Sequence, residues 1–314
     1  MIKLGLLSQR VGPIGIDLGS SRICACQLTG RRGRGLSAAV ELTRRGPDPL
    51  AEIPRLVRVM ARRGFRTAPV VVGIADAETT VAELSLPLAE RDAPISDIVA
   101  AQLGKLRQAL PNTLETCWWA TQPISAGGAT RSLAVALATS VGERVTEAFG
   151  TAGVTVAAIE PRPIAIARWC RPLVRTGLQV VVEVDINRAQ MIVLEQGLVS
   201  YVRPLAWHDG HSEIGAAPTD GVPLEAFLSD LRLSLGYLSH RHMNVAIDRL
   251  LLVGANANDP AIAEAIRASF EMETVVVSPD QYLALQRGPQ ATAGPATLAA
   301  LGLAAREEDE RCAA

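Results

Sequence analysis

Aromatic side chains are scarce in this sequence: Phe, Trp and Tyr together make up 4% of the residues, whereas hydrophobic residues make up 48%. The core must therefore be built from Ala, Val, Leu and Ile, which argues against an aromatic-rich β-sandwich and favours an α/β protein with buried strands. Cysteine is also rare, with five residues (an odd number) and no spacing typical of a metal site. This use of cysteine indicates a reducing, cytoplasmic environment.

The chain also lacks an excess of either charge and lacks a long hydrophobic run. Its 31 basic and 32 acidic residues give a formal net charge of −1, so bulk electrostatics provide no attraction to nucleic acid or anionic lipid. No apolar run approaches the ~18 to 20 residues of a membrane span, and residues 1–11 are too short and too polar for a signal peptide. We therefore expect a cytoplasmic protein with no nucleic-acid partner and no direct insertion into a membrane.

A polar turn between two apolar segments is the most informative stretch. Residues 14–16 and 23–28 alternate like the two strands of a hairpin, and Asp-Leu-Gly-Ser-Ser at 17–21 lies between them. A carboxylate at the end of a buried strand needs a partner, such as a metal, a basic side chain or a water molecule. Gly19 lets backbone amides approach a phosphate closely, and the two serines that follow it add hydroxyl donors. From these residues alone, the stretch is either an ordinary hairpin or a phosphate loop.

A second strand–acid–turn–strand segment at 179–197 repeats this pattern, with Asp185 in the place of Asp17. Two such hairpins indicate an internally duplicated protein of two lobes, each of which contributes one loop to a central cleft. A chain of 314 residues is long enough for this arrangement. We expect a first lobe at 1–177, which carries an inserted α+β segment at about 76–159, and a second lobe at 178–314.

Hydrophobic periodicity predicts the remaining elements. In the first lobe we expect strands at 36–43 and 69–74 and, between them, a helix at 50–64 that ends at Gly64. In the inserted segment we expect strands at 81–88, 115–122, 132–139 and 155–159, the first of them at a sheet edge, with helices at 96–110 and 141–149. In the second lobe we expect helices at 224–240, 261–270 and 293–305 and strands at 198–205, 249–254 and 274–277.

The opening segment, Ile-Gly-Ile-Asp-Leu-Gly-Ser-Ser at 14–21, resembles the first phosphate loop of the actin, heat-shock chaperone and sugar-kinase superfamily. The order of parts along nearly the whole chain resembles the PilM-type proteins of type IV pilus assembly, which are related to FtsA. The further segments that carry this resemblance are 84–88, 159–168, 230–237, 251–255 and 298–305. The resemblance implies an α/β, actin-like (ribonuclease H-like) fold of two lobes, with duplicated β-hairpin phosphate loops and a small inserted α+β subdomain.

The resemblance also implies a site for ATP with Mg²⁺ in the cleft. Asp17 would hold the metal through water, in keeping with the tendency of Mg²⁺ to retain several waters. Asp230 would approach the ribose. The residues expected at the phosphates are Gly19, Ser20, Ser21, Asp185 and Asn187, and those expected beside the base are Gly254 and Ala255.

Three departures from the family pattern indicate that ATP is bound weakly or not at all. Asn187 stands where the second loop would have glycine, Ala255 replaces the second glycine of the base loop, and Arg22 replaces an apolar residue. Glu160 is the candidate general base by position, and a cap of the following helix is the alternative role. We therefore predict no catalytic residue and at most a slow ATPase activity.

The function that the resemblance implies is that of a cytoplasmic adaptor in the assembly of a type IV pilus or a related secretion machine. The adaptor would recruit the short N-terminal cytoplasmic tail of an inner-membrane, PilN-like protein into a groove beside the inserted segment. It would thus lie peripherally at the inner membrane, and nucleotide would set the angle between its lobes. The alternatives are a slow ATPase or phosphotransferase of the same superfamily and an FtsA-like filament former, and homo-oligomerisation is left open.

Overall fold

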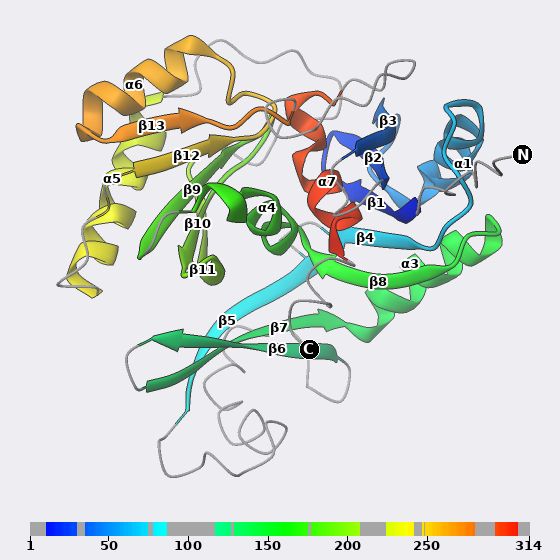
Figure 1. The fold of residues 1–314 in the computed structure, drawn as a ribbon, viewed down its shortest axis with the longest axis horizontal. Helices are drawn as coiled ribbons and strands as arrows, with labels where there is room; N and C mark the ends of the chain where they lie inside the picture. Colours follow the sequence, from blue (N-terminus) through cyan, green and yellow to red (C-terminus); the bar gives the residue numbers. More distant parts are fainter. Residues whose placement is uncertain are drawn as a thin grey trace, which may run out of the picture.

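The computed structural model of the chain contains three β-sheets among the residues that it describes (Figure 1). Two of these sheets have five strands each and the third has three. The described residues are 11–29, 35–74, 78–86, 117–126, 129–174, 177–207, 224–241, 247, 249–279 and 293–306.

The first sheet has the order β3-β2-β1-β4-β8, in which β1, β2 and β3 are antiparallel neighbours and β4 and β8 run parallel to β1. Helices α1 and α3 cover one face, where Leu56 and Phe149 pack in one buried cluster with Ile16 and Val72. The expected strands and the helix before β4 are confirmed, and Gly64, with φ of 79°, follows that helix. The elements of this part are β1 (Val11–Leu18), β2 (Arg22–Thr29), β3 (Gly35–Thr43), η2 (Leu50–Glu52), α1 (Ile53–Arg62), β4 (Val70–Ile74), α3 (Thr139–Thr151) and β8 (Val156–Pro161).

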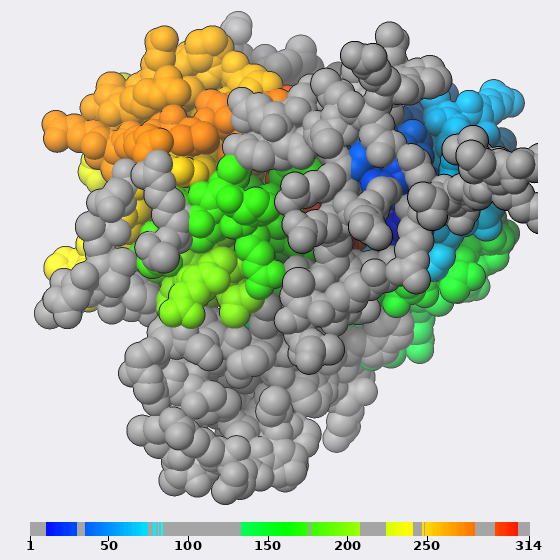
Figure 2. Space-filling view, in the orientation of Figure 1, coloured from blue at the N-terminus to red at the C-terminus, as the bar shows by residue number. Residues whose placement is uncertain are grey.

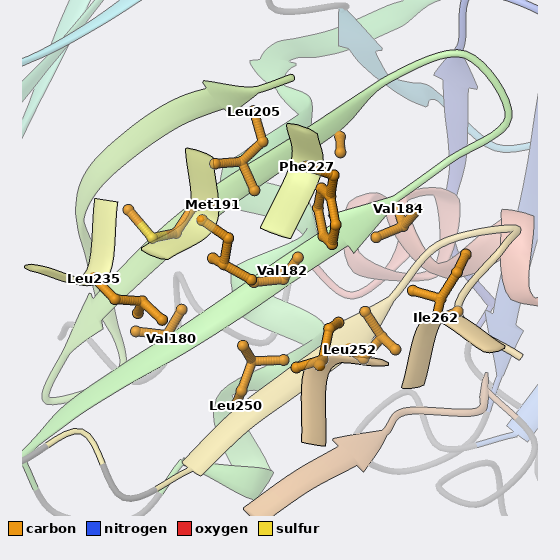
Figure 3. Close-up of a cluster of buried hydrophobic side chains, with 14 of the residues drawn as sticks. Val180, Val182, Val184, Met191, Leu205, Phe227, Leu235, Leu250, Leu252 and Ile262 are labelled. Atoms are coloured by element: carbon orange, nitrogen blue, oxygen red, sulfur yellow. The ribbon is translucent and has the colours of Figure 1, made fainter. Parts of the chain in front are cut away.

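The second sheet has the order β11-β10-β9-β12-β13 and the same strand directions. Helices α5 and α6 cover one face, where Phe227 and Ile262 pack against valines and leucines of the central strands (Figure 3). Helix α4 packs on the opposite face through Ile166 and Cys170. The elements are α4 (Arg162–Cys170), η6 (Arg171–Leu173), β9 (Leu178–Val184), β10 (Ala189–Glu195), β11 (Leu198–Leu205), α5 (Leu224–Arg241), β12 (Arg249–Val253), α6 (Pro260–Phe270) and β13 (Glu273–Val276).

The two five-stranded sheets are therefore topological copies of each other. Each consists of three consecutive antiparallel strands followed by two parallel strands that are reached through helices. The duplication that was inferred from the two Asp-containing hairpins is confirmed by this topology. Because β1 and β9 are the corresponding central strands, Asp17 and Asp185 lie at equivalent places in the two sheets.

The third sheet has the order β5-β7-β6, with both pairings antiparallel. It consists of β5 (Thr79–Leu86), β6 (Cys117–Ala126) and β7 (Ala129–Ala138), and the edge position expected for β5 is confirmed. The expected helix at 96–110 and the expected loop at 206–221, apart from its first two residues, lie outside the described residues.

One expectation for the inserted segment is wrong: its final strand, β8, pairs with β4 in the first sheet. The helix before it, α3, packs on that sheet through Val145 and Phe149. A helix that leaves a sheet and returns the chain to a parallel strand of the same sheet is the usual crossover, which explains this placement. The three-stranded sheet is thus inserted between β4 and α3. The division of the chain into lobes at residue 178 stays a prediction.

Helix α7 (Leu298–Ala304), preceded by η8 (Pro295–Thr297), lies between the two halves of the molecule and contacts both α4 and β1 (Figure 1). Two glycines permit this close packing. A Cβ added to Gly302 would lie 1.9 Å from the carbonyl oxygen of Ala165 in α4, and one added to Gly15 would lie 2.0 Å from that of Ala300. The Ala- and Gly-rich composition of 293–305 is therefore explained by backbone contact on two sides.

The space-filling view shows α1 and α6 at opposite ends of the molecule, with the green residues of α4 to β11 between them (Figure 2). Among the helices built from described residues, we find none long and apolar enough to cross a membrane.

Candidate functional site

The first candidate loop follows directly from the central strand of the first sheet. Asp17 is the penultimate residue of β1, and its side chain is buried. The turn after it requires glycine at position 19, because a Cβ there would lie 2.7 Å from the carbonyl oxygen of Arg22. Arg44 stabilises this turn: its Nη1 donates to the carbonyl oxygens of Gly19 at 3.0 Å and Ser20 at 2.6 Å. Burial lowers the pKa of the Arg44 guanidinium.

Arg44 also occupies the third backbone carbonyl of the loop. Its own amide donates to the carbonyl oxygen of Ser21 at 3.0 Å. The carbonyls of all three predicted phosphate-binding residues in this turn therefore accept hydrogen bonds from one arginine. The turn is held in a fixed conformation before any ligand arrives.

The second candidate loop begins at Asp185, immediately after β9. Its Oδ1 accepts a hydrogen bond from the amide of Ile186 at 3.0 Å, and its own amide donates to the carbonyl oxygen of Arg188 at 2.9 Å. Asn256 supports the loop from the neighbouring turn, because its Nδ2 donates to the carbonyl oxygen of Asp185 at 3.1 Å. Asn187 does not adopt a positive φ, so this turn does not require the glycine of the family pattern.

The structure brings the two loops into direct contact. The hydroxyl of Ser20 donates to Oδ1 of Asn187 at 2.6 Å, although the two residues are 167 positions apart in the chain. The asparagine that departs from the family pattern thus supplies the side chain that joins the loops.

A buried arginine, Arg162, lies between the carboxylates of the two loops. Its Nε donates to Oδ2 of Asp17 at 2.8 Å, and its Nη2 donates to Oδ2 of Asp185 at 3.1 Å. Its Nη1 forms an ion pair with Oε1 of Glu183 at 2.5 Å. The exposed fractions of Arg162 and Glu183 are only 3% and 1%, so this cluster is withdrawn from solvent.

Two further residues complete the polar cluster. Arg188 approaches Glu183 at 3.9 Å and Asp185 at 3.8 Å, and Nε2 of Gln190 donates to Oε2 of Glu183 at 2.5 Å. Sequence reasoning missed Arg162, Glu183 and Arg188. The sequence contained a signal, however: Glu183 and Asp185 are two positions apart at the end of a buried strand, and two buried carboxylates there require a nearby cation.

These residues do not fit a magnesium ion between the loops. Mg²⁺ needs oxygen ligands in near-octahedral geometry at about 2.0 to 2.1 Å, whereas a guanidinium offers only donors and repels a cation. The guanidinium of Arg162 already engages one carboxylate oxygen of Asp17 and one of Asp185. Within the described part of the chain, no group of three or more His, Cys, Asp or Glu side chains is arranged to hold a metal ion. The role of Asp17 as a metal ligand stays a prediction.

The residues predicted at the base and the ribose have structural partners. Gly254 has φ of 105°, and a Cβ there would lie 2.4 Å from the carbonyl oxygen of Val184, so the 254–256 turn packs against the second loop. Ala255 is half-buried. Asp230 accepts hydrogen bonds from Nη2 of Arg203 and from the amide of Ala206, both at 2.8 Å. Asp230 therefore ties α5 to the end of β11, and its contact with a ribose stays a prediction.

Glu160 is not arranged as a general base. Its two carboxylate oxygens accept hydrogen bonds from Arg168 at 2.9 and 3.1 Å, and Arg306 contacts the same carboxylate. The alternative expectation, that Glu160 caps the following helix, is also wrong, because the N-cap of α4 is Pro161 and no side chain caps it. Arg168 of α4 and Arg306, which follows α7, compensate the charge of this carboxylate, which explains its burial.

Comparison with known proteins reveals similarity of structure only. No protein-family model matches the sequence, and no curated protein matches it. The structure is similar to a chain of a PilM–PilN type IV pilus biogenesis complex, with a TM-score of 0.72 and 16% identity over 95% of this chain and 98% of the other.

Two further structures share the fold more distantly. A Bacteroides thetaiotaomicron protein with an actin-like ATPase fold and unknown function has a TM-score of 0.51 and 12% identity over 88% of this chain and 94% of its own. The cytoplasmic domain of EpsL, an inner-membrane component of the type II secretion system of Vibrio cholerae, has a TM-score of 0.51 and 9% identity over 96% and 95%. The predicted α/β, actin-like fold is confirmed by these similarities and by the duplicated sheets.

Proposed function

We propose that the protein is an actin-like adaptor of a type IV pilus or related secretion machine, and that it binds the cytoplasmic tail of an inner-membrane, PilN-like partner. The observation that supports this most strongly is the similarity to a chain of the PilM–PilN complex along almost the entire length of both chains. The similarity to the cytoplasmic domain of a secretion component points in the same direction. Through its partner, the adaptor lies at the cytoplasmic face of the inner membrane.

A pocket beside the inserted sheet is the place that we assign to the tail. The pocket has a volume of about 410 Å³ and lies between β8, α3 and the β5–β7 pair. The volume is within the range of ordinary ligand sites. Its lining residues are Thr79, Val135, Leu137, Thr146, the residues of 156–161 and Arg306.

This pocket suits an extended segment that carries both apolar and polar side chains, because its lining combines Val135 and Leu137 with Glu160 and Arg306. Strand β8 is at the edge of the first sheet, so one side of its backbone is not paired within that sheet. A peptide that aligns with such an edge gains main-chain hydrogen bonds, and pockets for its alternate side chains give specificity. Val135 and Leu137 provide the apolar wall opposite β8.

A second pocket, of about 370 Å³, is the competing location. It is lined by residues of α3 and of the 47–50 turn, and it contains the charged side chains of Asp48, Glu78 and Arg144. Both pockets contain charged side chains, and the lining of the second comes from outside the edge strand β8 and the inserted sheet.

Nucleotide has no required part in this function. The carboxylates of both candidate loops are engaged by Arg162, and Glu160 is engaged by Arg168. We therefore propose that the protein binds ATP weakly or not at all, and we propose no ATP hydrolysis.

The proposal is tested by calorimetric titration with a synthetic peptide of the partner's N-terminal cytoplasmic tail. We expect Ala157→Arg, which places a long cation on an exposed position of β8 at the pocket, to weaken binding at least about tenfold. The matched control is Ala61→Arg on the exposed face of α1, which should leave the affinity unchanged.

Two outcomes contradict the proposal in different ways. Absence of binding to the tail by the unmodified protein removes the adaptor function. If the peptide binds but Arg144→Glu rather than Ala157→Arg weakens it, the function stands and the tail lies in the second pocket.

A further inference from the structure

We infer that Arg162 is the permanent cation of the cleft, and that it joins the two lobes in place of a metal ion and nucleotide. Each of three guanidinium nitrogens faces a different carboxylate: Nε faces Asp17 at the end of the first sheet's central strand, and Nη1 and Nη2 face Glu183 and Asp185 of the second. One side chain therefore links equivalent positions of the duplicated sheets.

The electrostatics of the cluster require such a cation. Three carboxylates with exposed fractions of 2%, 1% and 7% lie around one point (Asp17, Glu183 and Asp185). Buried carboxylates that share a site repel one another and are tolerated only with a compensating positive charge. A guanidinium meets this need well, because its five donors lie in a fixed plane and it is weakly hydrated.

The backbone fixes Arg162 at this point. It is the first residue of α4, and it lies between Pro161, which is extended with φ of −63°, and Pro163. Helix α4 packs against the second sheet through Ile166 and Cys170 and against α7 through the contact of Ala165 with Gly302. The charged group is therefore held by a packed helix rather than by a loop.

The hydrogen bond from Ser20 to Asn187 closes the loops over the same region. With both contacts in place, the separation of the lobes is set within the chain, and nucleotide does not set the angle between them. This inference does not depend on the partner of the adaptor, because it concerns the cleft and not the pocket beside β8.

Thermal unfolding of the full chain tests the inference. We expect Arg162→Met to lower Tm by at least about 5 °C, since it removes the guanidinium between the three buried carboxylates and leaves Glu183 and Asp185 with the more distant Arg188. If these carboxylates then form a site for a divalent ion, 10 mM CaCl₂ or MgCl₂ should raise the Tm of the variant by about 3 °C or more at matched ionic strength. The unmodified protein should respond by less than about 1 °C.

The matched control is Arg168→Met. Arg168 is also an arginine of α4 with a mostly covered side chain (11% exposed), but its carboxylate partner is Glu160, which retains Arg306. Arg168→Met should have a lower Tm than the unmodified protein, and divalent ions should not raise it. Adding Asp17→Asn to Arg162→Met should remove the recovery. Should Arg162→Met not fold, Arg162→Lys tests the geometry instead: it keeps a positive charge but lacks the planar fork that faces three carboxylates, so it should lower Tm without a response to divalent ions.

Three results would overturn the inference: an unchanged Tm of Arg162→Met, an equal response of the Arg162 and Arg168 variants to divalent ions, or stabilisation of the unmodified protein by Mg²⁺ that Asp17→Asn abolishes. The tail-binding titration of Arg162→Lys separates this inference from the proposed function. Retained binding with a shifted Tm supports both, whereas lost tail binding by the unmodified protein leaves the cleft result standing.

Discussion

At the scale of single residues, Asn187 departs from the family pattern and has a structural role of its own. The expected glycine would have allowed a phosphate to approach, but the turn does not need a positive φ at this position. The asparagine side chain instead accepts a hydrogen bond from Ser20 in the other lobe. The sequence pattern identified both residues correctly as loop residues, but it could not indicate that they are partners of each other.

Replacement of Asn187 by glycine should lower the free energy of unfolding by about 1 to 2 kcal/mol, because it removes one hydrogen bond and adds backbone freedom to the unfolded chain. Urea unfolding measures this change. In a double-mutant cycle with Ser20→Ala, the two substitutions together should cost less than the sum of the single ones. Strict additivity would show that the hydrogen bond contributes nothing.

Cys24, Cys26 and Cys170 are buried free thiols, and burial raises the pKa of each of them, that of Cys170 to about 12. The thiolate is the reactive form, so these three residues should remain unlabelled by iodoacetamide in the native protein at pH 8. Peptide mapping by mass spectrometry, with a urea-unfolded sample as the control, checks this. Rapid native labelling at Cys24 would contradict the buried placement.

At the scale of elements, α7 determines how the halves of the molecule meet. It lies against β1 on one side and α4 on the other, and the contacts are backbone to backbone at Gly15 and Gly302. Composition predicted a helix of small residues there, but not its two neighbours, because nothing in the sequence indicates contacts with segments 130 or more positions away. Strand β8 was misplaced because its partner strand, β4, lies on the far side of the inserted sheet in the sequence.

Gly302→Ala should destabilise the protein by about 3 kcal/mol or more, since the new methyl group would meet the backbone of α4 and neither helix can yield without disturbing a packed core. Chemical unfolding measures the loss. The matched control is Gly236→Ala in α5, where no atom lies within 4 Å of the added Cβ. That substitution should leave stability equal or raise it by about 0.5 to 1 kcal/mol. Equal effects at the two glycines would contradict the close packing.

At the scale of the whole molecule, the sequence was most informative about the duplication. Two hairpins with an acid at the same place predicted two lobes, and the sheets have identical strand orders. The centre of the cleft was the least predictable part. The ion-pair cluster at this centre is built around Arg162, whose carboxylate partners lie 21, 23 and 145 positions away in the sequence. Local patterns reveal strands and turns, but a salt bridge across that distance is visible only after folding.

Calorimetric titration with Mg·ATP should give no saturable heat at millimolar nucleotide, because the carboxylates that would face the metal are bonded to Arg162. Asp17→Asn should behave identically in this titration. Micromolar binding that Asp17→Asn abolishes would show that nucleotide displaces the arginine.

The position of α7 near the end of the chain also has a consequence for biosynthesis. The face of the first sheet that carries Cys24, Cys26 and Leu28 is covered by Ala300 and Leu301. A ribosome therefore releases these strands before the residues of α7 that cover them, which follow Cys26 by more than 271 positions. During this interval the nascent chain presents a strand surface that favours aggregation, so it depends on rapid completion or on chaperone protection.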